Sequence, residues 1–274
     1  MRKIIKNVIN LLVHGKPKPL YANISYLSPR GCLKGKTVII TGGGRGLGYN
    51  MASKFISEGA EVLIAGRNMN TLEESATRLK CKCLQLDVSC PSDFEAFINN
   101  AVRLLGRIDI LVNNAGISLH EKTFFDVTPE TFDKQVDTNL KGSFFLTQSF
   151  ISYLKENKRG GNVLFISSET GDTMDFRPYG FTKAAVNSMV QGLAYLFAKD
   201  GIRINAVAPG ITASDMTGVD KNGDLTYPRN MLGRVYLPEE VAETACFLIS
   251  DASNCISGQI ITLNNGKSIN ARWK

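Results

Sequence analysis

The sequence predicts an α/β fold built on one doubly wound parallel sheet of about seven strands. From Lys36 onward, short β-rich runs alternate with helical stretches, the order typical of βαβ units. Several of the β-rich runs are almost continuously apolar, as expected of strands buried on both faces. The expected strands are TVII, EVLIA, KCLQLDV, DILVNN, NVLFIS, IRINAVA and QIITLN, and the expected helices lie around 46–58, 70–79, 92–105, 130–156, 179–199 and 238–250.

The size and composition of the chain are those of one large domain. At 274 residues with 43% hydrophobic content, it can bury a substantial core. No apolar run approaches the roughly 18 residues that cross a bilayer. The six cysteines form no C-x-x-C motif, so we expect reduced thiols in a cytoplasmic protein. With only His14 and His120 present, most histidine-based metal sites are excluded, and we expect no metal.

The basic residues are concentrated at the N-terminus. Residues 1–36 contain eight Lys and Arg side chains and no acid, which gives this segment a charge of +8. Because the whole chain carries +7, the remaining residues sum to −1. The positive charge therefore belongs to an N-terminal arm, and we expect no nucleic-acid partner. We divide the chain into this arm and its linker (1–34) and one α/β domain (35–274), whose nucleotide-binding motifs are described below.

The arm itself predicts a basic amphipathic helix over residues 1–14. Its apolar residues share one helical face, and its lysines and asparagines share the other. Such a helix either makes a peripheral membrane contact or packs on its own domain or a neighbouring subunit. The segment GKPKPLYANISYLSPRG has the Pro and Gly content of an extended linker.

A glycine-rich turn follows the first expected strand in TVIITGGGRGLG. Gly42, Gly46 and Gly48 permit a tight turn, close approach of a pyrophosphate and close helix packing, with the anion at the start of a helix near Leu47. A turn of this kind between a strand and a helix predicts a Rossmann-like dinucleotide site.

The end of the second strand indicates which dinucleotide binds. EVLIA is followed by Gly66 and Arg67, where an NAD site usually offers a carboxylate to the ribose. Arg67, together with Arg45 in the glycine-rich turn, could instead bind a 2′-phosphate. We therefore predict NADP(H); the less favoured alternative is that both arginines are solvated loop residues.

A tyrosine and a lysine stand four residues apart in RPYGFTK, where Pro178 suits the first turn of a helix. Residues i and i+4 share a helical face, so Tyr179 and Lys183 would lie side by side. The ammonium would lower the pKa of the phenol and let it exchange protons near neutral pH. Alone, this spacing is too common to establish chemistry.

Seven motifs in order resemble the single-domain short-chain dehydrogenases/reductases, and in particular their 3-oxoacyl-reductase-like branch, over roughly residues 35–267. They are TGGGRGLG (41–48), LDV (86–88), NNAG (113–116), Asn139 in DTNLKGSFF, ISS (166–168), PYGFTK (178–183) and INAVAPG (204–210). The resemblance implies a catalytic tetrad of Asn139, Ser168, Tyr179 and Lys183.

In this tetrad, Tyr179 would protonate a carbonyl oxygen while the cofactor delivers hydride. Lys183 would lower the tyrosine pKa and bind the nicotinamide ribose. Ser168 would hydrogen-bond the substrate oxygen, and Asn139 would hold a water. Ser167 competes with Ser168 for this role; the following ETG favours Ser168, although the interval to Tyr179 is short for the family.

The resemblance also implies further cofactor-binding residues. Asp87 and Val88 would lie near the adenine, Asn113, Ala115 and Gly116 along the adenosine ribose and sheet edge, Pro209, Gly210 and Thr212 beside the nicotinamide, and Ser214 against the cofactor. Thr212 departs from a usual aliphatic residue, and LNNG (263–266) departs from the common Asp-Gly-Gly.

The Y-x-x-x-K spacing resembles that of carbonyl and alcohol enzymes rather than that of enoyl reductases, which usually space the two residues more widely. We expect reduction of a ketone. A 3-oxoacyl thioester, which the resemblance implies, ranks slightly ahead of a polar keto metabolite such as a keto sugar. The keto sugar is the alternative because segment 213–230, the expected cover of the site, is polar. A non-catalytic NADP-binding scaffold or sensor is the remaining alternative.

The resemblance also implies a homo-oligomer, a dimer or tetramer, that pairs the helices around 130–156 and 179–199.

Overall fold

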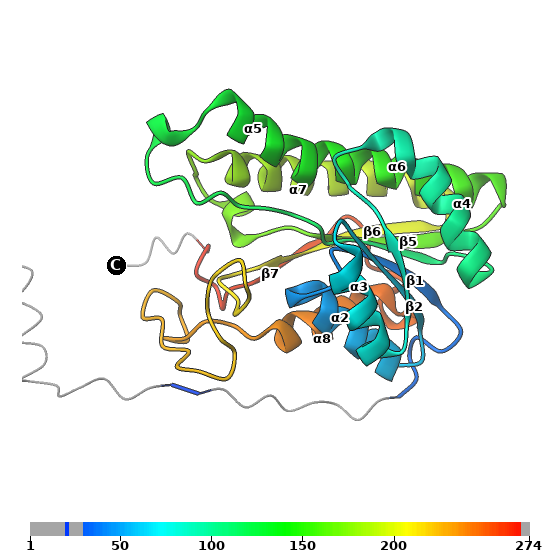
Figure 1. The fold of residues 1–274 in the computed structure, drawn as a ribbon, viewed down its shortest axis with the longest axis horizontal. Coiled ribbons are helices and arrows are strands. Elements are labelled where there is room, and N and C mark those ends of the chain that lie inside the picture. The colour runs from blue at the N-terminus through cyan, green and yellow to red at the C-terminus, as the bar shows by residue number, and fades with distance from the viewer. Residues whose placement is uncertain (1–19, 22–29, 270–274) are drawn as a thin grey trace, which may run out of the picture.

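The computed structural model describes residues 20–21 and 30–269 (Figure 1). The predicted helix over residues 1–14 and most of the predicted linker lie outside the described residues. The division at residues 34 and 35 stays a prediction. Within the described part of the chain, no helix combines the length and apolarity that crossing a membrane requires.

The predicted sheet is confirmed. Seven parallel strands stand in the order β3-β2-β1-β4-β5-β6-β7, so the chain winds outward from β1 first in one direction and then in the other. Their bounds are β1 Thr37–Thr41, β2 Glu61–Gly66, β3 Lys82–Gln85, β4 Ile110–Asn113, β5 Gly161–Ile166, β6 Ile202–Pro209 and β7 Ile260–Leu263.

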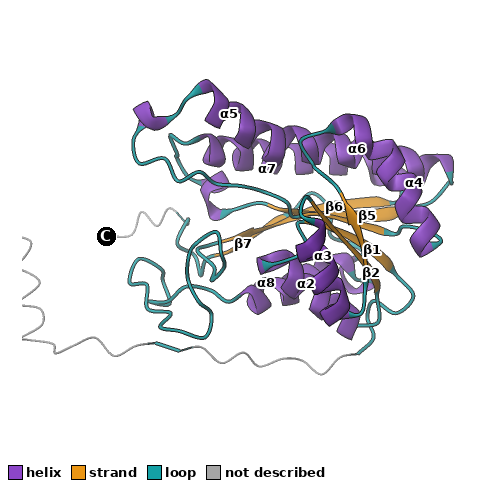
Figure 2. Cartoon of the chain, viewed as in Figure 1, coloured by secondary structure: helices purple, strands orange, loops and turns teal. Residues whose placement is uncertain are grey.

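Helices cover both faces of this sheet (Figure 2). On one face lie α2 (Gly46–Ser57), α3 (Met69–Leu79) and α8 (Pro238–Ile249). On the other lie α4 (Phe94–Leu105), α5 (Pro129–Val136), α6 (Gly142–Glu156) and α7 (Pro178–Phe197). The short 3₁₀ turns are η1 (Pro91–Asp93), η2 (Phe124–Asp126), η4 (Glu169–Asp172), η5 (Ala198–Asp200) and η6 (Asp251–Ser253).

The sheet is buried because its residues alternate between two apolar clusters. In β1, Ile39 packs into the cluster beneath α4, α6 and α7, whereas Val38 and Ile40 pack into the cluster beneath α2 and α8. All five residues of β1 are buried. A strand with both faces covered requires a continuous apolar run, which is what TVIIT provides.

One expected helix is interrupted. The stretch 130–156 divides into α5 and α6 around a π-helical turn, η3 (Asp137–Lys141). Gly142 lies so close to the main chain of Val88 that a Cβ there would meet the Val88 oxygen at 2.0 Å. Because π-turns are inserted into α-helices without a strong sequence signal, periodicity alone does not reveal this one.

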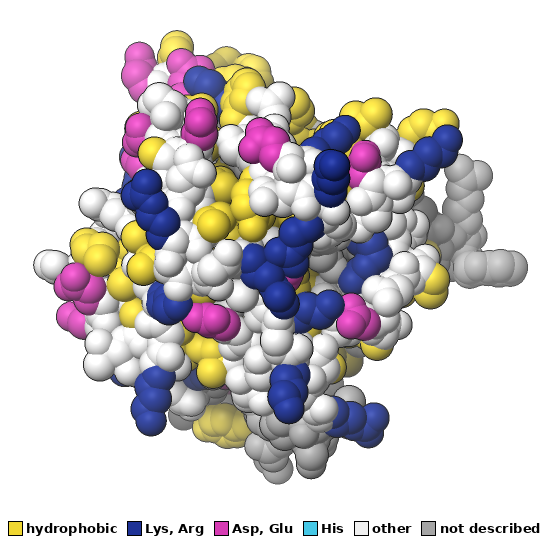
Figure 3. Space-filling model, turned by 90° about the vertical axis from the view of Figure 1, so that its right-hand side faces the viewer, with side chains coloured by type: hydrophobic (Ala, Val, Ile, Leu, Met, Phe, Trp, Pro, Cys, Tyr) yellow, Lys and Arg dark blue, Asp and Glu magenta, His cyan; other side chains and the backbone are white. Residues whose placement is uncertain are grey.

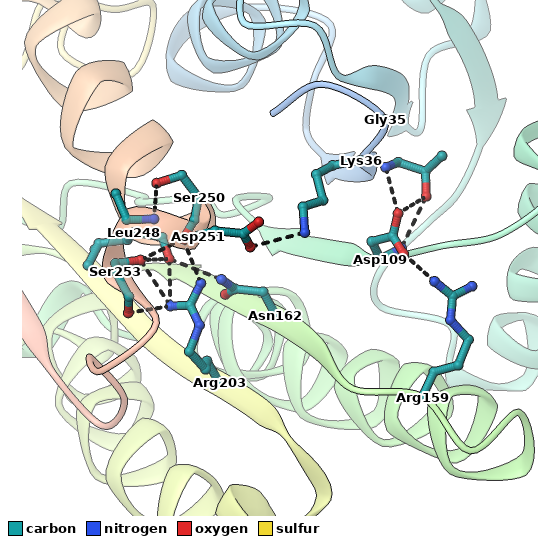
Figure 4. A network of polar contacts seen from close by, with 12 residues as sticks. Gly35, Lys36, Asp109, Arg159, Asn162, Arg203, Leu248, Ser250, Asp251 and Ser253 are labelled. Carbon is teal, nitrogen blue, oxygen red and sulfur yellow. Dashed lines mark hydrogen bonds and ion pairs between the residues drawn. The ribbon is translucent and has the colours of Figure 1, made fainter. Parts of the chain in front are cut away.

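A polar network joins the ends at which the strands begin (Figure 4). Asp109 accepts hydrogen bonds from Thr37 and from Arg159, and Arg203 donates to the main-chain oxygens of Leu248 and Ser250. Figure 3 shows Lys and Arg side chains gathered in the middle of this face. Asp109 forms ion pairs with Arg107 at 3.2 Å and with Arg159 at 2.5 Å.

A long segment follows β6 at the opposite edge, where the strands end. Residues 210–236 form two isolated bridges, Thr212 with Tyr236 and Thr226 with Arg234, rather than regular strands. Ala213, Leu225, Val235 and Leu237 form a small apolar cluster within it. The Leu225 N–H donates to the Leu20 oxygen at 3.0 Å, so residue 20 of the preceding linker borders this segment.

Candidate active site

Tyr179 and Lys183 lie in the first two turns of α7, with Pro178 at its first position. The Lys183 Nζ lies 5.5 Å from the centroid of the Tyr179 ring, as the i, i+4 spacing predicts. It donates a hydrogen bond of 2.8 Å to the Ile166 oxygen, at the carboxyl end of β5. The ammonium is thereby fixed between the helix and the sheet edge.

Burial changes the proton affinities of both groups. It lowers the pKa of the Lys183 ammonium to about 8. It raises the pKa of the Tyr179 phenol above its usual value, and neither the interaction with Ser168 nor the charge of Arg177 reverses this shift. The predicted net direction, a lowered tyrosine pKa, is therefore wrong for this arrangement, because desolvation of the phenolate outweighs the hydrogen bond with Ser168 and the charge of Arg177.

The two neighbouring serines, Ser167 and Ser168, have different partners in the structure. The Ser168 side chain interacts with the Tyr179 phenol, and its Oγ accepts hydrogen bonds from the Thr170 N–H at 3.2 Å and the Thr170 hydroxyl at 3.0 Å. The Ser167 Oγ instead donates to Asn187 Oδ1 of α7 at 2.6 Å and is buried there. Of the two serines, Ser168 is therefore the one beside the tyrosine.

Asn139 comes from the π-helical turn, which brings its buried side chain toward the sheet edge. Its Oδ1 accepts from the Ile117 N–H at 2.8 Å, and its Nδ2 donates to the Ile117 oxygen at 2.9 Å and to Thr182 Oγ1 at 3.3 Å. Asn139 thus joins the loop after β4 to α7. Its side chain is engaged in these contacts, and the role of holding a water stays a prediction.

The glycine-rich turn has the shape that a pyrophosphate requires. Gly42 has φ +65°, and a Cβ on Gly48 would meet the Gly42 oxygen at 2.3 Å, so both positions need glycine. The first turn of α2 has no side-chain cap. Within the described residues its first N–H groups, from Gly46, Leu47 and Gly48, have no acceptor, and they make a suitable anion site.

Asn114 supports this turn, a role that the sequence did not indicate. Its Nδ2 donates to the main-chain oxygens of Thr41 at 2.8 Å and Gly42 at 3.1 Å. The Thr41 hydroxyl in turn accepts from the Asn114 and Ala115 N–H groups. An amide that ties β1 to the loop after β4 could be found only once the two strands were known to be neighbours.

The two arginines predicted to bind a 2′-phosphate differ in their contacts. Arg45 forms an exposed ion pair at 3.3 Å with Asp215, which belongs to the segment that follows β6. Arg67 is exposed, and no ion pair involves its guanidinium among the residues that the structure describes. Hydrogen bonds from Ser89, together with the charge of Arg67, lower the pKa of Asp87 in spite of its desolvation.

The remaining predicted cofactor residues lie along the same edge. The Asn113 Nδ2 donates a hydrogen bond to Thr147 Oγ1 of α6 at 2.8 Å, so its side chain points toward that helix. A Cβ on Gly116 would lie 3.7 Å from Lys183 Nζ, which brings the NNAG segment close to this lysine. Val88 is buried, and Ala115 is partly buried against the apolar cluster beneath α7.

Pro209 ends β6, and the next residues turn along the end of β7. The Gly210 N–H donates to the Leu263 oxygen at 2.9 Å, and Thr212 Oγ1 donates to the Gly210 oxygen at 2.9 Å. Thr212 is buried, and its hydroxyl is satisfied within this turn. Ser214 Oγ donates to the Thr212 oxygen at 3.3 Å.

Three acidic residues near the site were not singled out from the sequence. Asp175 forms a bidentate pair with Arg177, two residues before Tyr179, at 2.8 Å for both contacts. Glu169 accepts from Asn264 and from Lys267, so the LNNG segment contacts the Ser168 loop. Glu121 is buried with Oε1 bound to Gln135 at 2.6 Å and Oε2 without a partner among the described residues.

Comparisons with known proteins agree with this arrangement. A family model described as "Enoyl-(Acyl carrier protein) reductase" matches residues 42–268. A 3alpha-hydroxysteroid dehydrogenase of Mediterraneibacter gnavus is 37% identical over 248 residues, covering 85% of this chain and 96% of the relative. A 3-oxoacyl-[acyl-carrier-protein] reductase of Thermotoga maritima is 35% identical over 243 residues, covering 85% and 98%.

A solved structure extends the similarity to three dimensions. The 3-ketoacyl-(acyl-carrier-protein) reductase of Brucella melitensis, complexed with NADH, superposes with a TM-score of 0.80 at 31% sequence identity. The superposition covers 86% of this chain and 100% of that one. The likeness therefore spans the whole sheet together with its helices.

Proposed function

Since the chain belongs to the short-chain dehydrogenase/reductase family of oxidoreductases, we propose that it is an NADPH-dependent carbonyl reductase that uses Asn139, Ser168, Tyr179 and Lys183. The observation that carries this proposal is the placement of Tyr179. Its phenol lies beside the Ser168 side chain, and the Lys183 ammonium lies 5.5 Å from its ring centroid. A general acid, a second hydroxyl donor and a cation thus meet at one edge of the sheet.

The protonation states suit reduction of a carbonyl. Because the pKa of Tyr179 is raised, the phenol holds its proton at neutral pH and can donate it to a substrate oxygen. The Ser168 hydroxyl would donate a second hydrogen bond to the same oxygen and so stabilise negative charge as it develops. A bound nicotinamide cofactor would supply the hydride. Lys183, with a pKa of about 8, remains largely charged at pH 7 and would stabilise the phenolate left after transfer.

Two features support NADPH as the cofactor. β2 ends at Gly66 and is followed by Arg67, with no carboxylate at the position that usually binds the ribose hydroxyls of NAD. The exposed Arg67 guanidinium is available to a 2′-phosphate, which would bind it through charge-assisted hydrogen bonds. Arg45 is the second candidate, and a 2′-phosphate there would compete with Asp215 for its guanidinium.

The printed description of the family model names an enoyl reductase, whereas the Tyr179 and Lys183 spacing favours carbonyl reduction. Both residues lie on one face of α7, four positions apart, so the lysine Nζ lies over the tyrosine ring. The relatives described above are named for acting on a hydroxysteroid and on 3-oxoacyl groups. We therefore propose a ketone rather than a carbon–carbon double bond as the reacting group.

Within ketones, a 3-oxoacyl thioester remains the first candidate. The sequence indicated a polar cover, but the segments that border Ser168 and Tyr179 also expose apolar side chains. Met174 and Phe176 precede Tyr179 with 102% and 43% of their surface exposed, and Met216 stands in the cover with 42% exposed. His120 hydrogen-bonds the Met216 oxygen at 3.0 Å, so the loop after β4 contacts the cover. Such a border suits an acyl chain.

A polar keto metabolite is the second candidate, favoured by Glu121. The Oε2 of this buried carboxylate has no hydrogen-bond partner among the described residues, and leaving a buried acceptor unpaired costs free energy. It is therefore a suitable acceptor for a substrate hydroxyl. The charge of Glu121 also interacts electrostatically with Arg177, two residues before Tyr179. A non-catalytic NADP-binding scaffold is the third possibility, and it would require that no ketone turn over although the cofactor binds.

We also propose that the chain forms a homo-oligomer through α6 and α7. These helices present a shallow apolar groove to the surface, in which Phe144 and Phe145 are 40% and 38% exposed. Leu196, at the end of α7, is 63% exposed. A second copy of the same face would cover this apolar surface, as isologous interfaces do. Membrane contact of residues 1–14 and cytoplasmic location stay predictions.

The proposed activity is tested by following NADPH oxidation with a panel of a 3-oxoacyl thioester, a keto sugar and a 3-ketosteroid, with NADH alongside. Turnover of a thioester with NADPH supports the first candidate, and turnover of the keto sugar alone supports the second. Tight NADPH binding with no turnover of any ketone would favour the scaffold. A preference for NADH would contradict the assignment of Arg67.

A further inference from the structure

Two cysteines far apart in the sequence meet on the side of the molecule away from the catalytic residues. Cys32 precedes β1 and is exposed, whereas Cys246 lies on α8 and is buried. Their Sγ atoms are 3.7 Å apart, although 214 positions separate them in the chain. This is van der Waals contact between two thiols, and a disulfide would require the atoms to approach to about 2.0 Å.

The surroundings hold Cys32 against Cys246. The N–H groups of Arg30, Gly31 and Cys32 all donate to Glu58 Oε2, at 3.1, 3.1 and 3.3 Å. The next residue, Leu33, is fully buried and donates to the Glu58 main-chain oxygen at 3.1 Å. The contact between the thiols is therefore fixed by hydrogen bonds and by packing on both sides of Cys32.

The same contacts argue against a metal ion at this place. Cys32, Cys246 and Glu58 offer three ligand atoms within 4.8 Å of one another. Glu58 Oε2 already accepts three main-chain hydrogen bonds, and Oε1 pairs with Lys54 at 2.9 Å. A carboxylate so occupied has little capacity left for an ion, and a lysine beside it repels cations. The two sulfurs alone are the reactive pair.

We propose that Cys32 and Cys246 form a reversible disulfide when the protein meets a peroxide. The exposed Cys32 sulfur attacks one oxygen of hydrogen peroxide: an S–O bond forms, the O–O bond breaks, and the leaving hydroxide takes a proton to become water. The Cys246 sulfur then attacks the Cys32 sulfenic acid: an S–S bond forms, the S–O bond breaks, and the hydroxide takes the Cys246 proton. Two thiols are oxidised, one peroxide is reduced, and two waters leave.

The pair should react slowly at neutral pH and faster in mild alkali. Burial raises the pKa of the Cys32 thiol above its usual value and that of the Cys246 thiol further still. Because the thiolate is the nucleophile, a raised pKa lowers the reactive fraction at pH 7. The rate of disulfide formation should therefore increase as the pH rises from 7 to 9.

The bond would fasten the segment that precedes β1 to α8. Residues before Cys32 lead back to Leu20, which borders the segment after β6. Closing a loop of this length restricts the unfolded chain and so stabilises the folded one. Oxidised protein should therefore unfold at a higher temperature than reduced protein.

The test uses the full chain with EDTA throughout, treated with hydrogen peroxide and then with an alkylating reagent. Digestion without reductant should give a cross-linked pair of peptides containing Cys32 and Cys246, two hydrogens lighter than the reduced pair and separated by dithiothreitol. Trypsin leaves Cys246 and Cys255 in one peptide, so a second digest that cuts after Phe247 assigns the partner.

Variants make the assignment specific. Cys32→Ser and Cys246→Ser should each abolish the cross-link and the rise in unfolding temperature, whereas Cys90→Ser and Cys255→Ser, which remove other exposed thiols, should retain both. A cross-link that joins any other pair would overturn the proposal. So would over-oxidation of Cys32 while Cys246 stays a free thiol in the wild-type chain.

Discussion

Lys183 holds its ammonium 5.5 Å from the centroid of the Tyr179 ring and donates a hydrogen bond to the Ile166 oxygen. This relationship fixes the cation beside the phenol, and no carboxylate pairs with the lysine in the part of the chain that the structure describes. Since burial raises the tyrosine pKa and lowers the lysine pKa, the resting pair keeps the phenol protonated. Tyr179 is thereby set to give a proton, which is the direction that ketone reduction needs.

The two neighbouring serines offer a direct comparison. Ser168→Ala should lower kcat by about 10²-fold, because it removes one hydroxyl donor from the oxygen on which charge develops. Ser167→Ala should leave kcat within a few-fold of wild type and instead lower the free energy of unfolding by about 1–3 kcal/mol, since Asn187 Oδ1 loses a buried donor. Steady-state kinetics and urea unfolding on both variants measure the two effects. The opposite pattern would assign catalysis to Ser167.

Asp215 should weaken NADPH binding through its ion pair with Arg45. Asp215→Asn should tighten NADPH by up to about fivefold, the size of an exposed ion pair, and should leave NADH nearly unchanged. Asp220→Asn, which removes another exposed acid of the same segment, serves as the matched control. Fluorescence titration of wild type and both variants with each cofactor gives the six dissociation constants. Equal tightening of NADH and NADPH would show that Arg45 does not bind the 2′-phosphate.

The buried lysine should make stability depend on pH. The Lys183 pKa is about 8 in the folded chain and 10.5 in its usual environment, so the unfolded chain binds more protons between these values. The free energy of unfolding should therefore rise with pH from 8 to 10.5, by up to about 3 kcal/mol from this group. Urea unfolding of wild type and Lys183→Met over pH 7–9.5 isolates the contribution. Parallel curves for the two proteins would contradict the shift.

The proposed interface on α6 and α7 predicts the effect of a single charge. Phe145→Glu should reduce the subunit count, because a carboxylate would be buried in an apolar contact. Phe125→Glu changes an aromatic residue that is 92% exposed outside these helices and should leave the count unchanged. Light scattering after size-exclusion chromatography measures both. An unchanged mass for Phe145→Glu, where the wild type is an oligomer, would place the interface elsewhere.

The sheet and the order of its elements could be predicted from the sequence because the signals are local. Apolar runs such as TVII and EVLIA form β1 and β2, and the glycine-rich turn lies between β1 and α2. The Tyr179 and Lys183 pair also follows from helical spacing alone.

The features that the sequence did not reveal depend on neighbours distant in the chain. The π-helical turn that presents Asn139, the support of the glycine-rich turn by Asn114, and the pairing of Arg45 with Asp215 all require the folded arrangement. The predicted direction of the Tyr179 pKa shift was wrong for the same reason. Desolvation depends on everything packed around the phenol, whereas the sequence shows only the nearby lysine.

The most direct test of the central claim compares Tyr179→Phe with Tyr195→Phe, which changes a 90% exposed tyrosine on the same helix. With NADPH and the ketone that turns over best, Tyr179→Phe should lower kcat by about 10²–10⁴-fold, the usual contribution of a general acid, while the dissociation constant for NADPH stays within a few-fold. Tyr195→Phe should retain wild-type kcat. If Tyr179→Phe kept wild-type turnover, Tyr179 would not be the proton donor and the proposed mechanism would be contradicted.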